Sequence, residues 1–304
     1  MGTTSKVPSP CQISQRRRIF KLADVVNGVI PATIAVLNGI IKVGLSKTEF
    51  KKLSEQSYNK LLKISRRDLS FVISQGLSGG TTISSTIAIA KAMNLPVIAT
   101  GGMGGVHRDS DISMDISADL KQLGEASIAV VCSGIKSLLD VSKTLEYLET
   151  ISVPVITIGS SSKFPAFLCQ ETYEGLESHL HLKNVRSASE LIVIEKYLQS
   201  EIGTLIAVPV PKKFSMKPEE VEKIIEKIKT ETTGIKGQNV TPFFLKQLSE
   251  LSSNQTKHSN IALLKNNAEV AAELAICLNL NRRKKYISNK YADTVSFNNK
   301  LPVC

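Results

Sequence analysis

The sequence predicts a single α/β domain in which helices cover both faces of a mostly buried mixed sheet. Short runs rich in Val and Ile alternate with amphipathic helical patterns along most of the chain, and these runs are almost entirely apolar. Strands that are apolar on both faces are typical of a sheet lying between two helical layers. A chain of 304 residues, 42% of them hydrophobic, is long enough to bury such a core. We therefore expect α/β/α layers.

The first element is predicted to be a β-hairpin at residues 32–46, ATIAVLNGIIKVGLS. Two β-branched runs flank Asn38-Gly39 there, and Asn-Gly is a favoured pair for the type I′ turn of a two-residue hairpin. Short apolar runs that indicate further strands follow at LSFVIS (69–74), LPVIAT (95–100), SIAVVCSG (127–134), VPVITIG (153–159) and GTLIAVPV (203–210).

Helices are expected between and after these strands, because apolar residues recur there at the spacing of one helix face. The helical patterns are TTISSTIAIAKAMN (81–94), IKSLLDVSKTLEYLET (135–150), SASELIVIEKYLQS (187–200), KPEEVEKIIEKIKTET (217–232) and SNIALLKNNAEVAAELAICLNL (259–280). Without an internal repeat or a linker, the chain divides into a disordered basic lead (1–18), one domain (19–281) and a basic polar tail (282–304).

The net charge of +11 invites a nucleic-acid interpretation. Much of the excess lies at the ends, in QRRR (15–18) and RRKK (282–285), and the chain has no Trp on which a base could stack. Solvated terminal charge is the simpler explanation, and a basic protein also suits an anionic small substrate. We expect a small-molecule substrate and no nucleic-acid partner.

Cysteine usage and hydropathy indicate where the protein works. Five widely spaced cysteines without a CxxC pair are typical of reduced thiols inside a cell. No apolar run approaches the roughly 18 residues that a membrane span needs. The first twenty residues hold Lys and Arg but no acid, which is compatible with a mitochondrial presequence. We expect a cytoplasmic protein with no membrane partner, and a mitochondrial location stays open.

The most distinctive stretch is TGGMGGVHRDSDISMDISADL, residues 100–120. Gly102-Met103-Gly104 begins a dinucleotide-binding fingerprint, but His107 stands where the third glycine is required. The acids of this stretch fall at mixed spacings without the order of an EF-hand loop. Two interpretations stay open, a solvated loop with acids at a positive helix end, or a loop in which one or two carboxylates bind a hard divalent ion.

A second candidate feature is Lys136, which follows the apolar run VVC and is predicted to lie in the first turn of a helix. The positive end of a helix dipole lowers the affinity of a lysine for its proton. A neutral lysine amine is a nucleophile that forms an imine with a sugar aldehyde. The alternative is an ordinary exposed lysine, and the residues by themselves favour that alternative.

The order of several long motifs resembles the pseudouridine-5′-phosphate glycosidase family, also called indigoidine synthase A-like. The resemblance runs from Ile30 to Leu280 and is carried by VPATIAVLNGIIKVGLS, KISRRDLS, GLSGGTT, VIATGGMGGVHR, MDISADL, VVCSGIKSLLD, TLEYLET, FPAF, VTPFFLKQLSEL and NIALLKNNAEVAAELA. It implies reversible cleavage of the C–C glycosidic bond of pseudouridine 5′-phosphate to uracil and ribose 5-phosphate. It also implies a homotrimer.

The resemblance assigns roles to particular residues. Lys136 of VVCSGIK corresponds to the lysine that forms an imine with the ring-opened ribose. Asp115 corresponds to the ligand of a divalent metal, usually manganese, and Lys63 to a substrate lysine that we expect at the phosphate. Further substrate contacts are expected at Ile83, Ser117, Ala118 and Asp119, and we add Thr100, His107 and Asn260 as residues lining the same pocket.

The chain departs from the family at its start. Family members carry a general-acid Glu on a strand ahead of the VPATIAVL motif, whereas the first Glu of this chain is Glu49. Glu49 belongs to the predicted helix start GLSKTEF and is not a substitute, and Asp24 is a poor one. A truncated gene model or isoform, or a copy that has lost its acid, would explain this. The alternative function is therefore a relative of low activity that still binds sugar phosphates.

Overall fold

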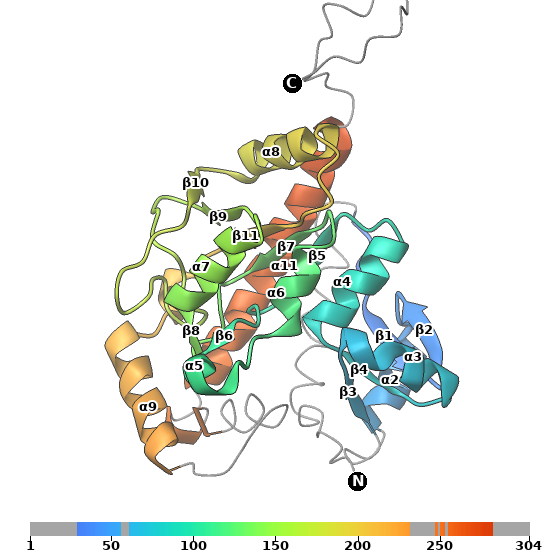
Figure 1. The fold of residues 1–304 in the computed structure, drawn as a ribbon, viewed down its shortest axis with the longest axis horizontal. Coiled ribbons are helices and arrows are strands. Elements are labelled where there is room, and N and C mark those ends of the chain that lie inside the picture. The colour runs from blue at the N-terminus through green and yellow to red at the C-terminus, as the bar shows by residue number, and fades with distance from the viewer. Residues whose placement is uncertain (1–28, 56–60, 232–246, 249, 253–254, 282–304) are drawn as a thin grey trace, which may run out of the picture.

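The computed structural model describes residues 29–55, 61–231, 247–248, 250–252 and 255–281. The predicted lead at 1–18, the predicted tail at 282–304 and the domain boundary at residue 19 lie outside these residues. Within them the predicted α/β class is confirmed. Figure 1 shows a parallel sheet with helices on both sides, and a smaller sheet beside it that is built from the first third of the chain.

The central sheet has five parallel strands in the order β10-β9-β11-β7-β5. The strands β7, β9 and β11 are buried on both faces, since all four residues of each are buried. Four of the five runs predicted as strands after the hairpin form four of these strands, and β10 was not predicted. Their bounds are β5 Val97–Ala99, β7 Ala129–Cys132, β9 Val155–Ile158, β10 Leu180–Leu182 and β11 Thr204–Ala207.

Helices cover the two faces of this sheet with separate apolar clusters, which gives the expected α/β/α layers. On one face, α8 (Val185–Tyr197) and α11 (Gln255–Asn281) pack on alternate residues of β7, β9 and β11. On the other face, α4 (Ile83–Ala92), α6 (Ala118–Leu123), α7 (Val141–Thr150) and α9 (Pro218–Glu231) pack on the residues in between. None of the described helices is both long and apolar enough to cross a membrane.

The smaller sheet has the order β2-β1-β4-β3 and combines antiparallel with parallel pairs. The sheet between the helical layers was predicted to be mixed and is instead wholly parallel. The hairpin is confirmed, because β1 (Ile34–Leu37) and β2 (Ile40–Val43) pair antiparallel. The turn residues Asn38 and Gly39 have φ of 49° and 74°, as a type I′ turn requires. β3 (Leu62–Ile64) and β4 (Gly79–Thr81) complete the sheet and run parallel to each other. The helix α2 (Lys47–Glu55) follows the hairpin.

One predicted strand is wrong. The run LSFVIS forms the helix α3 (Leu69–Ser74), which follows the short helix η1 (Arg66–Asp68). Ser65 and Asp68 start this turn with a reciprocal capping box, in which the Ser65 amide donates to Asp68 Oδ2 at 2.9 Å. Leu69 and Val72 are buried three residues apart, whereas Phe71 is 63% exposed. A short apolar run does not distinguish strand from helix, and here the cap decides.

One predicted helix begins later than expected. The pattern at 135–150 forms α7 only from Val141, where the Asp140 side chain accepts a hydrogen bond of 3.0 Å from the Lys143 amide. The residues before it form a loop and the two-residue strand β8 (Leu139–Asp140), which pairs with β6 (Val106–His107). Lys136 therefore does not lie in the first turn of a helix. Two short helices, α5 (Ser110–Ser113) and η2 (Lys212–Phe214), complete the described elements that border the site.

Candidate functional site

The glycine-rich segment and the loop carrying Lys136 extend from neighbouring strands and run side by side beyond the carboxyl edge of the central sheet. The Ser133 amide donates to the Gly101 carbonyl at 2.8 Å, and the Met103 amide donates to the Gly134 carbonyl at 2.9 Å. The Lys136 amide donates to the Met103 carbonyl at 3.1 Å. The main chain at Lys136 is thus held directly by the glycine-rich segment. This edge is where α/β sheets bind their ligands.

Asp119 joins three segments at the centre of the site. Its side chain is 6% exposed, and Oδ1 accepts a hydrogen bond of 2.8 Å from the Ser84 amide in the first turn of α4. Oδ2 accepts one of 3.1 Å from the Gly104 amide. Each carboxylate oxygen keeps a second lone pair. Asp119 lies in the first turn of α6, as the interpretation with acids at a positive helix end expects, and its carboxylate also bonds to the first turn of α4.

Position 104 requires a glycine because the side chains of Asp119 and Ser117 lie too close to its main chain for a Cβ. A Cβ at Gly104 would lie 2.2 Å from Ser117 Oγ and 2.6 Å from Asp119 Oδ2. The glycine-rich segment is therefore packed tightly against the start of α6, and Gly104 directs its amide at a carboxylate of the protein itself. This arrangement differs from a phosphate cradle, in which such amides face a bound anion.

Lys63 reaches the same place from the smaller sheet. β3 is joined to the start of α4, since the Thr82 amide donates to the Ile64 carbonyl at 2.9 Å and the Ser65 and Ser84 hydroxyls lie 3.0 Å apart. Burial lowers the pKa of Lys63, and the positive charge of Lys136 lowers it further. The carboxylates of Asp119 and Asp115 act in the opposite direction. The charges of three predicted site residues, from two other segments, thus act on the pKa of Lys63.

His107 and Asp115 form a second pair at this site. His107 Nε2 lies 3.7 Å from Asp115 Oδ2, and the His107 amide donates to the Asp115 carbonyl at 3.0 Å. The Asp115 side chain is 41% exposed. No group of three potential metal-binding side chains exists among the described residues. A divalent ion here would have one carboxylate, with water or substrate oxygens as its other ligands, which suits a hard cation.

The other predicted contacts lie at the edges of this arrangement. Ser117 caps α6, accepting a 3.3 Å hydrogen bond from the Asp119 amide, and Ala118 is the exposed first residue of that helix. Ile83 is the half-buried first residue of α4. Thr100 follows β5, where its amide donates to the Val131 carbonyl at 2.9 Å. These four residues frame the site, and their roles stay predictions.

Asn260 is carried by α11. The Asn267 side chain of this helix bonds to the end of β5, while Ala271 and Leu274 pack deeper against the strands. The part of α11 that precedes Asn267 therefore extends beyond the carboxyl edge of the sheet. Asn260 lies two turns earlier, roughly 10 Å along the helix axis. Its place in the predicted pocket stays a prediction.

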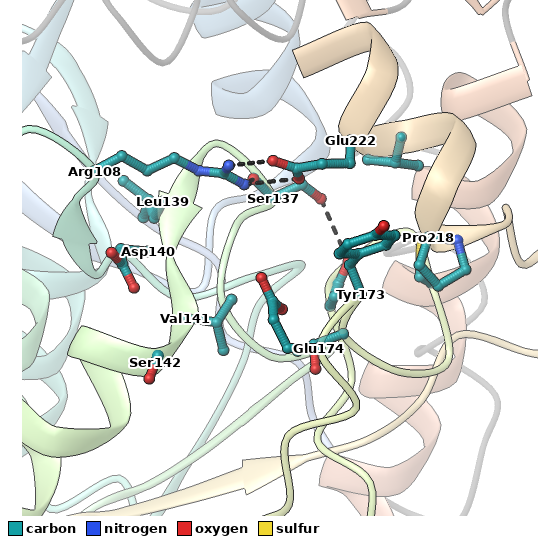
Figure 2. Close-up of a pocket in the computed structure, with 14 residues that line it drawn as sticks. Arg108, Ser137, Leu139, Asp140, Val141, Ser142, Tyr173, Glu174, Pro218 and Glu222 are labelled. Atoms are coloured by element: carbon teal, nitrogen blue, oxygen red, sulfur yellow. Dashed lines mark hydrogen bonds and ion pairs between the residues drawn. The ribbon is translucent and has the colours of Figure 1, made fainter. Parts of the chain in front are cut away.

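A separate cavity of about 170 Å³ lies beside the predicted residues (Figure 2). Arg108 crosses it with a paired hydrogen bond to Glu222 of α9, and Arg108 Nη2 donates to the Ser137 carbonyl at 3.2 Å. Burial opposes the charge of Arg108, but the hydrogen bonds and charge of Glu222 raise its pKa. Arg108 is the residue after His107, and Ser137 is the residue after Lys136. The hydrogen bond between Arg108 and Ser137 therefore joins the two loops that carry His107 and Lys136.

Sequence reasoning missed Arg108, Glu222 and Asn267. Asn267 could have been found in the sequence, because it is a polar residue on an otherwise apolar helix face. It also lies seven residues after Asn260, which places the two residues on the same side of the helix. Arg108 and Glu222 are distant along the chain, and neither stands in a pattern that would pair them.

The fold and this edge define a parallel α/β protein with a charged site of lysines and carboxylates at the strand ends. The chain matches the model of the family described as Indigoidine synthase A like protein over residues 6–277. The chain therefore belongs to the indigoidine synthase A-like family.

Relatives and solved structures agree with this assignment. A Pseudouridine-5′-phosphate glycosidase of Caldanaerobacter subterraneus subsp. tengcongensis is 38% identical over 275 residues, covering 90% of this chain and 88% of that protein. A Pseudouridine-metabolizing bifunctional protein of Schizosaccharomyces pombe is 44% identical over 256 residues, covering 82% of this chain and 34% of that protein. The chain thus spans about a third of that bifunctional relative.

Two crystal structures share the fold. An indigoidine synthase A (IdgA)-like protein from Thermotoga maritima matches with a TM-score of 0.79 and 31% identity, covering 89% of this chain and 87% of that one. The prealnumycin C-glycosynthase AlnA, in complex with ribulose 5-phosphate, matches with a TM-score of 0.79 and 28% identity, covering 90% and 92%. The predicted family and fold class are both confirmed.

Proposed function

We propose that this chain cleaves the C–C glycosidic bond of pseudouridine 5′-phosphate, reversibly, to give uracil and ribose 5-phosphate. The observation that carries the proposal is the set of hydrogen bonds that links the segments of Lys136, Asp119 and Lys63. The Lys136 amide bonds to the glycine-rich segment, the Asp119 carboxylate bonds to that segment and to the start of α4, and the start of α4 bonds to the residues after β3. The curated relatives named for this activity support the reaction. AlnA, a structural relative, has been solved with ribulose 5-phosphate, which supports a sugar phosphate as the class of ligand.

Lys136 is the residue proposed to do the covalent step. Its amine bonds to C1′ of the ribose as the bond from C1′ to the ring oxygen breaks, and the proton lost by the new C–N centre is balanced by the one that the ring oxygen gains as it becomes a hydroxyl. The nitrogen lone pair then forms a double bond to C1′ while the bond between C1′ and uracil breaks. The electron pair of that bond goes to uracil, which gains a proton, and C1′ is left as an imine of Lys136. Water then hydrolyses the imine, releasing ribose 5-phosphate and the free lysine. A carbon leaving group explains why a nucleophilic lysine replaces the carboxylate pair of ordinary glycosidases.

Lys63 is proposed to hold the phosphate, since a half-buried ammonium group provides a strong point charge for an oxyanion. Asp115, with His107 beside it, is proposed to hold Mn²⁺ through its half-exposed carboxylate. A divalent ion supplies charge that orients and polarises bound oxygen atoms. Ile83, Ser117, Ala118, Asp119, Thr100 and Asn260 are proposed to shape the pocket. A homotrimer remains part of the proposal and is checked by light scattering of the purified chain.

A second candidate function is a relative that binds sugar phosphates with little turnover. The observation that favours it concerns Glu49, whose carboxylate is occupied by neighbouring groups of the protein itself. Glu49 lies in the first turn of α2, where the Ser46 amide donates to Oε2 at 3.0 Å and Lys42 Nζ lies 3.0 Å from Oε1. The Ser46 hydrogen bond and Lys42 lower the pKa of Glu49 to about 2. A carboxyl group that is ionised at neutral pH is not a proton donor.

Trapping by borohydride tests the covalent step. The chain is incubated with ribose 5-phosphate and borohydride, and the modified peptide is identified by mass. The expected adduct lies on the Lys136 peptide and disappears in Lys136→Ala, while Lys121→Ala is the matched control because Lys121 is exposed on α6. Equal trapping in Lys136→Ala would refute the role of Lys136. Uracil release from pseudouridine 5′-phosphate, measured in parallel, separates the glycosidase from the relative that only binds.

A further inference from the structure

Asn267 is a fully buried polar side chain in the middle of α11, with 0% of it exposed. Leu263 and Leu274 of the same helix are also fully buried and belong to the clusters on the two sides of it. A primary amide in such surroundings is unfavourable unless its polar atoms find partners. The partners of Asn267 are therefore informative about why the helix has an amide at this position.

All three hydrogen bonds of Asn267 go to the ends of two strands that lead into the site. Nδ2 donates to the Thr100 carbonyl at 2.8 Å and to the Gly101 carbonyl at 3.2 Å. Oδ1 accepts from the Ser133 hydroxyl at 3.1 Å. The Ser133 amide in turn donates to the Gly101 carbonyl at 2.8 Å. One side chain thus spans the point at which β5 and β7 leave the sheet.

The junction of these two strand ends sets the course of both site loops. Beyond Gly101 the glycine-rich segment runs alongside residues 133–136, and the Met103 carbonyl accepts from the Lys136 amide. A change in the spacing of the two strand ends would be passed along this pairing to Lys136. Buried groups that are packed and bonded on every side transmit such shifts, because the interior has little free volume.

We propose that Asn267 is a positioning residue for Lys136, which fixes the direction of the lysine loop by holding the ends of β5 and β7 together. It acts through the main chain and touches no substrate. This inference rests on the proposed role of Lys136 as the nucleophile. Apolar contacts alone would attach α11 to the sheet. The Asn267 amide adds hydrogen bonds that fix the orientation of the strand ends, since its two N–H groups face carbonyls and its oxygen faces a hydroxyl.

The neighbouring residue provides a matched control. Asn266 Nδ2 donates to the Pro209 carbonyl at 3.4 Å. Pro209 follows β11, so this bond is made to a different strand end and a different segment from those of Lys136. Asn267→Asp keeps the size of the side chain but replaces its donors with an oxygen that faces the two carbonyls. Asn266→Asp makes the same chemical change one residue away.

The experiment measures the rate of borohydride trapping of ribose 5-phosphate at Lys136 under saturating sugar phosphate, together with the Kd of ribose 5-phosphate and the melting temperature. We expect Asn267→Asp to trap at least about 10-fold more slowly than the unmodified chain, because a misplacement of about 1 Å costs up to about 100-fold in rate. Its Kd for ribose 5-phosphate should stay within a few fold of that of the unmodified chain. Asn266→Asp should trap at the native rate. A merely structural role would lower the melting temperature of Asn267→Asp and leave the saturated rate unchanged.

Ser133→Ala keeps the inference testable if Asn267→Asp does not fold. It removes one hydroxyl from a buried position and with it the bond to Oδ1. Where Asn267→Asp does not fold, slower saturated trapping in Ser133→Ala supports the inference and an unchanged rate in folded Ser133→Ala overturns it. Absence of any adduct on Lys136 in the unmodified chain overturns the proposed function and this inference together. An adduct there with unchanged rates in both variants overturns this inference alone.

Discussion

Lys63 lies on β3 of the smaller sheet and Lys136 in the loop after β7 of the central sheet, and the charge of Lys136 lowers the pKa of Lys63, after the larger effect of burial. Two cations thus act on each other across the two sheets, with Asp119 and Asp115 acting in the opposite direction. Such an arrangement is unfavourable in the absence of an anion. It is the electrostatic pattern expected of a site that receives a phosphate.

The lowered pKa of Lys63 predicts how binding depends on pH. A phosphate is held by the protonated amine, so affinity is full below the lowered pKa and falls as pH rises through it, before pH reaches the ordinary lysine value near 10.5. The Kd of ribose 5-phosphate should therefore increase on the alkaline side. Lys63→Arg keeps its charge throughout this range and should flatten the profile, while Lys63→Met should bind weakly at every pH. An identical alkaline loss in Lys63→Arg would remove Lys63 from the phosphate site.

The hydrogen bonds of Asp119 predict a loss of stability in Asp119→Asn. The amide group would point one N–H donor at the amide of Ser84 or Gly104, leaving a buried donor without an acceptor. The expected destabilisation is about 1–3 kcal/mol, measured by urea unfolding. Asp109→Asn is the control, because Asp109 is exposed and makes no side-chain cap bond. Equal unfolding midpoints in the two variants would contradict this account.

The close packing at Gly104 predicts that Gly104→Ala is destabilised and impaired. The added methyl group would lie 2.2 Å from Ser117 Oγ, so the start of α6 must shift. Overpacking of this kind costs about 1–3 kcal/mol, and trapping at Lys136 should slow with it. Gly80→Ala provides the comparison, since a Cβ there meets nothing within 4 Å. Thermal unfolding and trapping of both variants check the prediction, which fails if Gly104→Ala resembles Gly80→Ala.

Asp115 is expected to govern manganese binding. Its half-exposed carboxylate would supply the protein ligand, so Asp115→Asn should lower the affinity for Mn²⁺ by at least about 10-fold, in line with the loss of a charged oxygen ligand. Electron paramagnetic resonance of free Mn²⁺ measures this without reference to activity. Asp111→Asn is the control, because Asp111 is paired with Lys143 at 2.7 Å. Native affinity in Asp115→Asn would exclude it as the ligand.

The sequence by itself determined the elements whose signals are local. Asn38-Gly39 specifies its turn because both residues accept positive φ. Four continuous apolar runs became parallel strands, and three of them, β7, β9 and β11, are buried throughout, which is the environment that suits two apolar faces. The fourth, β5, lies at the edge of the sheet and is only partly buried. The motifs were long enough to identify the family. They also predicted Lys63, Asp115, Asp119 and Lys136 as site residues, although no sequence pattern shows that the charge of Lys136 acts on Lys63.

Tertiary structure decided the rest, and in each case through a contact between distant residues or a competing local bond. LSFVIS suits either a strand or a helix, and the capping box of Ser65 and Asp68 selects the helix. Lys136 lies outside α7 because its amide is taken by the Met103 carbonyl and Asp140 caps the helix four residues later. In the sequence, Asn267 is one amide residue within a helical pattern. Only the fold places it against Thr100, Gly101 and Ser133. Helix and strand periods report which side of an element is buried, whereas hydrogen bonds between strand ends depend on how the layers are stacked.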